Sequence, residues 1–520
     1  MTSLWTAAAI PDESEPTPTS RYEGVVDPGE RFDVAVVGAG ITGLATAIML
    51  VQGGMRVVVL EAERVAALAS GLNTGKASVL QGAMLQRIRS THSARVVRGY
   101  ADANLDGQRW IAEFCEHHGV PVSVETAYSY ARSDSGLRTV DREVEAAIEA
   151  GLPAERVDAL DVPFPFSGAV ALPGQLGLDP YRLVVAMART FVAEGGVLLE
   201  GMRVQHVHAD RPVELQTPRG VVRADVAVVA TGAPTLLRGL YWAKTSHNRS
   251  YLTSYRIPEE LADVLPSGLF ISVDSPTRSV RTTPDPESGV PDAAPPVLLV
   301  GGNGHPVGRI PSNEERVLDL VDWTGRFFPG AELTHRWAAQ DYTSANLVPF
   351  VGRMPRGRGR IWTATGYAKW GLTNGAAAAI RISEEILGVP WMQRRSWIRV
   401  LGTRVSAPAD LGRGAAENAQ IAAELTAGYA RAQRHPAPAR KPAEGEGVVV
   451  SRGGVPYGVS TVDGVTCAVR AVCTHLGGPL TWNDAEHTWD CPLHASRFTA
   501  TGTRIEGPAV RDLHRERRGD

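Results

Sequence analysis

Two pairs of cysteine and histidine residues near the carboxyl end have the types and the spacing of a metal site. Cys473 and His475 are separated by one residue, Cys491 and His494 are separated by two, and 15 residues lie between the pairs. Thiolates and imidazoles together are ligands for zinc and for iron. Structural zinc sites more often use Cys-x2-4-Cys with His-x3-5-His, so this spacing is not the usual one for zinc.

The segments around these pairs resemble the Rieske [2Fe-2S] family, and the resemblance covers residues 447–513. Leu476-Gly-Gly-Pro479 follows the first pair, and Gly507-Pro-Ala509 lies near the end of the chain. The resemblance implies that Cys473 and Cys491 bind one iron of a [2Fe-2S] cluster and that His475 and His494 bind the other.

Four positions near the cluster pairs predict its redox properties. High-potential members of the family carry one further cysteine in each loop, joined as a disulfide, where this chain has Gly478 and Leu493. Ser496 retains a hydroxyl that can donate a hydrogen bond toward the cluster, whereas Phe498 replaces a tyrosine that often adds a second donor. We therefore expect an intermediate potential within the family's range of about −150 to +300 mV.

A glycine-rich segment near the amino end has the chemistry of a dinucleotide site. Gly38-Ala-Gly40-Ile-Thr42-Gly43 follows an apolar run, Phe32–Val37, and opens a helical pattern, Ile41–Gln52. The three glycines permit a tight turn, a close approach of the backbone to a pyrophosphate, and close packing of helix on strand. Glu61 ends the next apolar run and can accept hydrogen bonds from a ribose. The pattern predicts a Rossmann-type site but does not separate FAD from NAD.

Two Ala-Thr-Gly turns distinguish between these cofactors. They end at Gly232 and at Gly366, and the second continues through Tyr367–Gly375 into a helix. With these turns, residues 31–390 resemble the glycine oxidase/D-amino-acid oxidase superfamily of FAD proteins. The resemblance implies that the second turn lies over the flavin, with a helix N-terminus that stabilises negative charge on the reduced ring. It implies these cofactor-binding residues: Gly38, Gly40, Thr42, Gly43, Glu61, Asn73, Thr74, Lys76, Val204, Thr231, Gly232, Gly366, Trp370, Gly371, Leu372 and Thr373.

Three side chains are candidates for catalysis. Lys76 and Lys369 are two of only four lysines, and both lie in segments that the resemblance places beside the flavin. A lysine there would stabilise an anionic reduced ring or pair with a substrate carboxylate; the alternative is that each is simply exposed to solvent. His305 would either face the substrate cavity or be an ordinary loop histidine. Three arginines are candidate carboxylate clamps, and nothing selects one: Arg249, Arg256 and Arg309.

The elements that must position these residues follow from the hydrophobic patterns. A strand-helix-strand unit at 31–60 and short glycine-punctuated β runs after residue 447 predict an α/β plus all-β fold. We expect a Rossmann-type FAD-binding domain with an interleaved α+β substrate domain, followed by a small β-sandwich Rieske domain. Asp274–Pro296, rich in Pro, Ser and Asp, predicts a surface loop. The expected segments are an extension at 1–30, the FAD unit at 31–390 (substrate parts at about 91–165 and 240–340), a helical connector at 391–433, a linker at 434–446 and the Rieske domain at 447–520.

The composition excludes several classes of protein. The net charge of −3 gives no indication of a nucleic-acid partner. The longest apolar runs, such as Ala376–Ile380, are far shorter than the roughly 20 residues of a membrane span. No basic, then apolar, secretory pattern begins the chain. Four cysteines are too few for a disulfide framework, so we expect a reducing compartment, the cytoplasm.

The two resemblances together predict an activity. The first implies oxidation of a C–N bond of an amine or amino acid by hydride transfer to FAD. A one-electron centre in the same chain favours a dehydrogenase, in which electrons pass singly to the cluster and then to an external carrier such as a ferredoxin or a quinone-linked acceptor. The alternatives are a flavin monooxygenase or reductase fed by the Rieske domain, and a non-catalytic electron-transfer module. No second Gly-x-Gly-x-x-Gly is present, so no NAD(P)H site is expected.

Overall fold

The structure is a computed structural model that describes residues 1–7, 30–233, 235–236, 238–259, 265–287, 296–402, 408–434 and 440–515. Most of the predicted extension, residues 8–29, lies outside the described residues, as does part of the predicted linker, residues 435–439. The first seven residues include a short helix, α1, whose Leu4 and Trp5 are buried. The indole of Trp5 donates a hydrogen bond to the carbonyl of Asn73.

A parallel sheet forms the dinucleotide-binding part of the chain. Its strand order is β16-β17-β10-β1-β2-β7, and β17, β10, β1, β2 and β7 run parallel. Strand β1 is buried along most of its length because the sheet is covered on both faces. The strands, with β8 and β9 attached through β10, are β1 (Arg31–Val37), β2 (Val57–Leu60), β7 (Val197–Leu199), β8 (His206–His208), β9 (Val213–Thr217), β10 (Gly220–Val229), β16 (Phe350–Arg353) and β17 (Ile361–Thr365).

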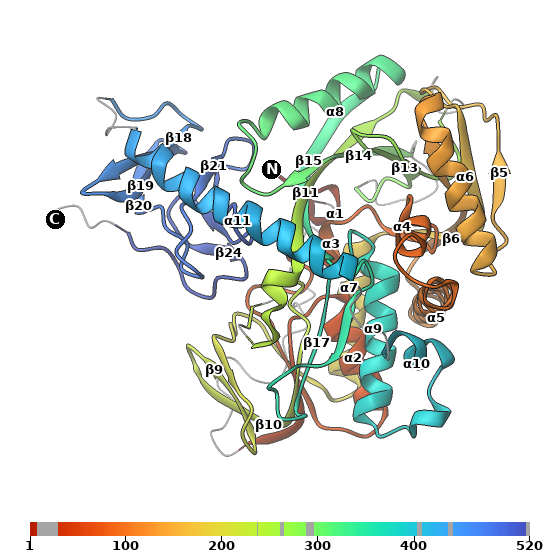
Figure 1. Cartoon of the computed structure of the whole chain (residues 1–520), viewed down its shortest axis with the longest axis horizontal. Helices are drawn as coiled ribbons and strands as arrows, with labels where there is room; N and C mark the ends of the chain where they lie inside the picture. Colours follow the sequence, from red (N-terminus) through yellow and green to blue (C-terminus); the bar gives the residue numbers. More distant parts are fainter. Residues whose placement is uncertain are drawn as a thin grey trace.

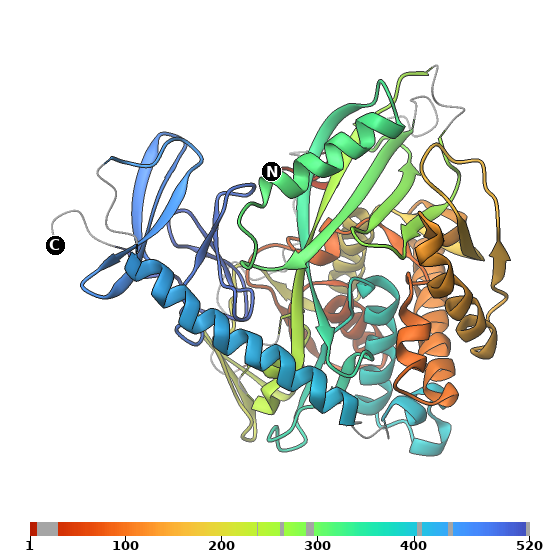
Figure 2. The same cartoon turned by 45° about the horizontal axis from the view of Figure 1, so that its top comes forward.

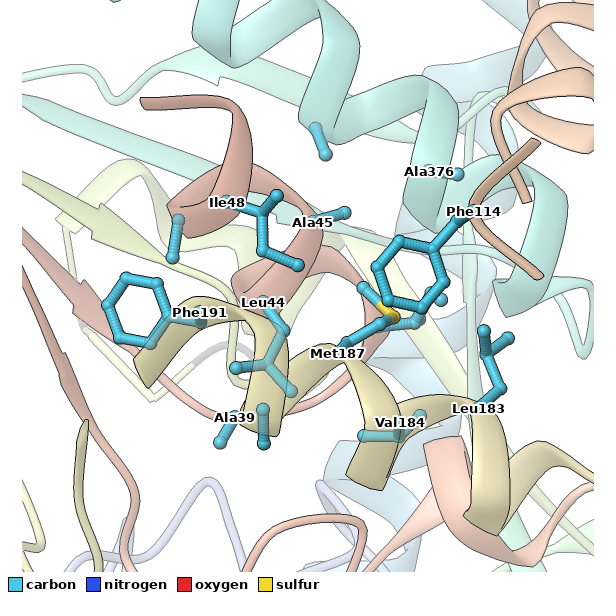
Figure 3. Packing of buried hydrophobic residues seen from close by; sticks show 14 of the residues in the cluster. Ala39, Leu44, Ala45, Ile48, Phe114, Leu183, Val184, Met187, Phe191 and Ala376 are labelled. Carbon is cyan, nitrogen blue, oxygen red and sulfur yellow. The ribbon is translucent and has the colours of Figure 1, made fainter. Parts of the chain in front are cut away.

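Helices pack against this sheet and fix the helix that follows the glycine turn. Leu44 and Ile48 of α2 belong to one buried cluster with Phe114 of α5 and with Met187 and Phe191 of α7 (Figure 3). The helices are α1 (Leu4–Ala7), α2 (Ile41–Gln52), α3 (Ala69–Leu72), α4 (Met84–Arg89), α5 (Ala94–His118), α6 (Asp134–Glu149), α7 (Pro180–Ala193), α8 (Glu314–Phe327), α9 (Gly371–Ile386), α10 (Ser396–Gly402) and α11 (Pro408–Arg434), with 3-10 segments η1 (Arg238–Lys244) and η3 (Trp391–Gln393).

A second sheet, mostly antiparallel, forms the predicted substrate part. Its order is β15-β11-β14-β13-β12-β4-β6-β3, and β5 pairs with β6. Its longest strands, β15 and β11, lie side by side at one edge. The strands are β3 (Lys76–Ala77), β4 (Val122–Ala131), β5 (Glu155–Val157), β6 (Gly168–Leu178), β11 (Thr245–Arg256), β12 (Leu269–Ser272), β13 (Arg278–Thr283), β14 (Val297–Pro306) and β15 (Glu332–Ser344).

The prediction of a surface loop at Asp274–Pro296 was wrong for its first half, because β13 lies within the sheet. Residues 288–295 of this segment lie outside the described residues. Arg278 and Arg281 of β13 are almost fully buried. Their burial is possible because Arg278 pairs with Asp319 and Arg281 donates to backbone carbonyls, including that of Gly75. These partners are distant in sequence, so the Pro, Ser and Asp content of the segment, on which the prediction rested, did not indicate the buried strand.

Two small sheets make up the C-terminal β unit, by which we mean the described residues 440–515. One contains β18 (Gly447–Arg452), β19 (Val455–Val462) and β20 (Val465–Arg470); the other contains β21 (Thr481–Asn483), β22 (Thr488–Asp490), β23 (Arg497–Thr499) and β24 (Arg504–Glu506). Helix α11 runs from the body of the molecule along this unit (Figure 1), and the turned view agrees (Figure 2). The predicted fold class, α/β plus all-β, is confirmed. In the part of the chain that is described, no helix is long and apolar enough to cross a membrane.

Candidate cofactor sites and the wall between them

The glycine turn has the geometry of a dinucleotide site. Gly38 has a φ of +104°, and a Cβ at Gly43 would lie 1.9 Å from the carbonyl oxygen of Gly38, so neither position accepts a side chain. The carboxylate of Glu61 accepts a hydrogen bond from the amide of Ala39 at 2.8 Å. Burial raises the pKa of Glu61. Because the turn carries no bulky side chains, a pyrophosphate such as that of FAD can approach the N-terminus of α2 closely.

Two adjoining cavities extend from this turn. We name the first the outer cavity. It is lined by six of the predicted cofactor-binding residues together with a segment of the C-terminal β unit. The predicted residues are Gly38, Gly40, Glu61, Val204, Thr231 and Gly232. The contribution of the C-terminal β unit is Arg504, Glu506, Gly507 and Val510, which the sequence did not predict.

We name the second the inner cavity, which lies where the resemblance places the flavin ring and substrate. It shares Gly40, Ser70, Gly232 and Gln340 with the outer cavity, so the two are continuous. The hydroxyl of Thr42 bonds to that of Tyr367 at its wall, at 2.9 Å. Its lining includes these predicted residues: Gly40, Thr42, Asn73, Thr74, Lys76, Gly232, Gly366, Lys369, Trp370, Gly371 and Leu372.

The two candidate lysines lie in this lining but differ in their surroundings. The Nζ of Lys76 is buried and donates to the carbonyls of Phe270 and Val280 and to the hydroxyl of Ser279. The solvent-exposed alternative is therefore wrong for Lys76, whose pKa is lowered by burial and by Arg281. Lys369 is exposed to the cavity, and its Nζ donates to Ser250 at 2.8 Å.

Other predicted site residues lie away from the cavities. His305 lies within strand β14 rather than in a loop, is buried, and bonds to the hydroxyl of Tyr251. Thr373 donates to Asn104 in a buried polar network. None of the described residues lining the inner cavity is an arginine. Arg309 instead donates to the carbonyl of Pro492, and Arg256 is exposed at the end of β11.

Strands β11 and β15 form a wall with two different faces. Ala339, Gln340, Asp341 and Tyr342 of β15 all border the inner cavity. The side chains of Gln340 and Tyr342 bond to the C-terminal β unit, so strand alternation places Ala339 and Asp341 on the opposite face of β15. The side-chain amide of Gln340 donates to the carbonyl of Ala495 at 3.0 Å, and the hydroxyl of Tyr342 donates to that of Gly507 at 3.3 Å. The sequence analysis missed these residues, because polar residues occur along most of β15 and none of them stands out from the pattern.

The four predicted cluster ligands form two pairs in the C-terminal β unit, one of thiols and one of imidazoles. The thiols of Cys473 and Cys491 are hydrogen-bonded to each other, which lowers the pKa of Cys473 and raises that of Cys491. The rings of His475 and His494 lie 5.2 Å apart between centroids. Burial lowers the pKa of His475 to about 4, and burial, then the charges of His475 and Arg309, lower that of His494 to about 3, so both rings are neutral at pH 7.

The arrangement fits a binuclear cluster better than a single ion. Within the described ranges, both ring nitrogens of His475 and the Nε2 of His494 are buried without a hydrogen-bond partner. Such orphaned atoms are what bound iron would satisfy. No three metal-binding side chains of the described residues converge on one point. A thiol pair beside an imidazole pair is the donor set of a [2Fe-2S] cluster with two Cys on one iron and two His on the other.

The four positions that we expect to influence the potential of the cluster lie beside its ligands. A Cβ at Gly478 would lie 2.4 Å from the Cδ1 of Leu493, so these two positions face each other. The hydroxyl of Ser496 bonds to Cys473, and Phe498 is fully buried. Trp242 of η1 contacts the ring of His494 edge-on, with 4.9 Å between the ring centroids. A residue from outside the C-terminal β unit therefore covers the imidazole side of the site.

A buried charge cluster ties the two parts of the chain together. Arg249 of β11 bonds to Glu486, and Arg497 bonds to Glu486 and Asp490 while approaching Glu506. Burial alone would raise the pKa of Glu486, but the two guanidiniums hold it at about 2. Removal of one partner would leave an uncompensated buried charge, so the cluster requires that Arg249 and the C-terminal β unit remain in contact. Arg249 is therefore an interface residue and not a carboxylate clamp.

Comparison with known proteins confirms the two predicted families. The family model described as FAD dependent oxidoreductase matches residues 33–385, and the model described as Rieske [2Fe-2S] domain matches residues 435–515. These matches identify FAD and a Rieske cluster as the cofactors, and the C-terminal β unit as a Rieske domain.

Individual relatives cover either the whole chain or its first part. The putative Rieske 2Fe-2S iron-sulfur protein YhfW of Bacillus subtilis is 27% identical over 92% of both chains. The gamma-glutamylputrescine oxidoreductase of Escherichia coli is 24% identical over 68% of this chain and 84% of its own. The glycine oxidase of Geobacillus kaustophilus has a similar fold, with a TM-score of 0.57 at 20% identity over 68% of this chain and 94% of its own. The chain belongs to the family of FAD-dependent oxidoreductases, with a Rieske [2Fe-2S] domain after its FAD-binding part.

Proposed function

We propose that this oxidoreductase is a dehydrogenase that oxidises a C–N bond of an amine or amino acid and passes the electrons singly to its own Rieske cluster. When bound, FAD accepts a hydride and the cluster accepts one electron at a time. The observation that carries the proposal is the wall of β11 and β15. Gln340 borders the inner cavity and bonds to Ala495, the residue that follows the cluster ligand His494.

Two further contacts support electron transfer between the FAD-binding part and the Rieske domain. Tyr342 borders both cavities and bonds to the carbonyl of Gly507 in the Rieske domain. Trp242 contacts His475 and His494, so the imidazole side of the cluster site faces the FAD-binding part. Two relatives, named for gamma-glutamylputrescine and glycine, support an amino-group-containing substrate.

The electron count requires a partner. A hydride carries two electrons and the cluster holds one, so two successive transfers must leave the cluster for an external one-electron carrier, such as a ferredoxin or a quinone-linked acceptor. The four cysteines are free, which supports a reducing cytoplasm as the compartment.

Anaerobic mixing tests this proposal. A panel of amines and amino acids is added to the oxidised holoenzyme, and flavin absorbance and the EPR signal of the reduced cluster are followed together. We expect at least one compound to bleach the flavin, with the cluster signal appearing afterwards. Bleaching by a reduced ferredoxin, but by no amine, would instead establish the reverse flow, and bleaching without any cluster signal would refute transfer through the Rieske domain.

A further inference from the structure

The inner cavity contains one acidic side chain to which the proposed dehydrogenase assigns no role. Asp341 of β15 is the sole carboxylate among the described residues of the lining. Its Oδ2 is buried and has no hydrogen-bond partner within the described structure. Lys369 lines the same cavity but bonds to Ser250, and no ion pair joins it to Asp341 in the described ranges.

The charges around Asp341 favour a cation over an anion. The described lining contains no arginine, and the three donor positions of Lys76 are already occupied by protein oxygens. An unpaired carboxylate that lies partly out of bulk solvent attracts a cation and repels a second carboxylate more strongly than it would in water. Cross-strand from Asp341 on β11 is Asn248, which carries no charge.

We propose that Asp341 binds the protonated amino group of the substrate and accepts its proton, so that the enzyme acts on amines that carry no carboxylate at the reacting end. The inference rests on the proposed function and specifies its substrate class. Strand alternation directs Asp341 to the cavity that the family assigns to flavin and substrate, while its neighbours Gln340 and Tyr342 hold the Rieske domain.

The step balances as follows. The substrate ammonium gives one proton to the Asp341 carboxylate, which becomes a neutral acid, and the substrate becomes a neutral amine. The C–H bond next to nitrogen then breaks, its electron pair and hydrogen pass as hydride to FAD, and the nitrogen lone pair forms a C=N bond. The products are a substrate iminium ion and FAD reduced by two electrons, and the iminium ion is later hydrolysed by water.

The surroundings of Asp341 match this role. Burial raises the pKa of Asp341 to about 6 and the charge of Lys369 opposes the rise, so the group is ionised at pH 7 and is a stronger base than a solvated aspartate. The other titratable groups of the lining are Lys76, Lys369 and three tyrosines. Burial raises the pKa values of the tyrosines and lowers that of Lys76. Because several groups in the lining have shifted pKa values, a substitution of Asp341 is needed to assign a pH effect to this residue.

Binding of simple probes to the oxidised holoenzyme tests the site without turnover. n-Butylammonium, neutral 1-pentanol and butyrate are titrated while the flavin absorption is followed. We expect the parent enzyme to bind butylammonium more tightly than butyrate, and Asp341→Asn to weaken butylammonium binding by tenfold or more while pentanol binding changes less than about twofold. Below pH 6 the dissociation constant of butylammonium for the parent should rise about tenfold per pH unit, and that of Asp341→Asn should stay flat.

Two controls separate this result from misfolding and from a general charge effect. Asp322→Asn makes the same chemical change at an exposed position of α8, and it should leave all three dissociation constants unchanged. The thermal midpoint of Asp341→Asn at pH 8 should equal or exceed that of the parent, because a buried unpaired charge is removed.

The outcomes distinguish this inference from the proposed function. Equal butylammonium binding by parent and Asp341→Asn, or tighter binding of butyrate than of butylammonium by the parent, overturns the inference. If butylammonium binding depends on Asp341 but no amine bleaches the flavin, the cation site is supported and the proposed oxidation fails. If amines bleach the flavin of Asp341→Asn at the parent's rate, the oxidation holds and the role of Asp341 is overturned.

Discussion

At the scale of residues, the potential of the cluster depends on a few hydrogen bonds within the Rieske domain. The hydroxyl of Ser496 accepts from the amide of Ala509 at 2.9 Å and bonds to the sulfur of Cys473. The pKa of Cys473 is lowered chiefly by its bond to Cys491, with a smaller contribution from Ser496. A donor to a ligand sulfur stabilises the more negative, reduced cluster and therefore raises its potential.

We therefore predict that Ser496→Ala lowers the reduction potential of the cluster. A hydrogen bond to a charged group is worth about 1.5–3 kcal/mol, and a tenfold change in a one-electron equilibrium is about 59 mV, so the expected decrease is at most on the order of 65–130 mV. Potentiometric EPR titration measures it. Ser460→Ala is the matched control, since this buried hydroxyl in β19 has no partner in the described structure. Equal shifts in the two variants would contradict the role of Ser496.

At the scale of elements, helix α11 joins the FAD-binding part to the cluster loops. In its first half, Asn418 donates to the carbonyl of Ala243. Near its end, the hydroxyl of Tyr429 donates to the carbonyl of Gly477, and Gly428 lies so close to Pro479 that a Cβ there would be 3.1 Å from its ring. The helix can approach the cluster loop because residue 428 has no side chain.

This close contact predicts a difference between two glycines of one helix. Gly428→Val should lower the free energy of unfolding by about 1–3 kcal/mol, as overpacking usually does, and should slow electron transfer from flavin to cluster. Gly414→Val is the control, because nothing lies within 4 Å of a Cβ at that position and the same substitution changes the helix propensity by the same amount at both positions. Chemical denaturation gives the free energies. If the Gly428→Val and Gly414→Val proteins were equally stable, α11 would not be closely packed against the cluster loop at residue 428.

Features that depend on residues close by in the sequence could be predicted from it. Features that depend on contacts with residues far away in the sequence could not. The helix expected at Ile41–Gln52 has those bounds in the structure, because its apolar spacing and its preceding glycines lie within the same segment. The burial of Lys76 depends on carbonyls of β12 and β13, about 200 positions further along the chain. The orientation of Asp341 depends on the pairing of β15 with β11, which fixes which alternate residues face the cavity.

At the scale of the whole molecule, each part completes a site of the other. Trp242 covers the imidazole side of the cluster site, and the segment Arg504–Val510 of the Rieske domain lines the outer cavity beside the glycine turn. Gly507 lies against Thr235 and Ala233, next to the first Ala-Thr-Gly turn. FAD in this cavity would therefore be enclosed partly by the Rieske domain.

Arg504 provides the test of this enclosure. It is 7% exposed, its Nη1 donates to the carbonyl of Ala509, and its Nε has no partner among the residues that the structure describes. A buried guanidinium that lines a dinucleotide cavity and lacks a described carboxylate partner is suited to a phosphate.

We therefore predict that Arg504→Gln raises the dissociation constant of FAD by about ten- to hundredfold, the equivalent of 1.5–3 kcal/mol for a charge-assisted hydrogen bond. The fluorescence of FAD released on dilution measures the change, and the cluster EPR signal reports whether the Rieske domain remains folded. Arg511→Gln removes an exposed arginine of the same domain and should leave FAD affinity unchanged. If Arg504→Gln retained FAD as tightly as the parent while its cluster stayed intact, the FAD-binding part would hold its cofactor without help from the Rieske domain. A loss specific to Arg504 would mean that FAD binding and Rieske docking stabilise each other, because whatever displaces the domain also exposes the dinucleotide.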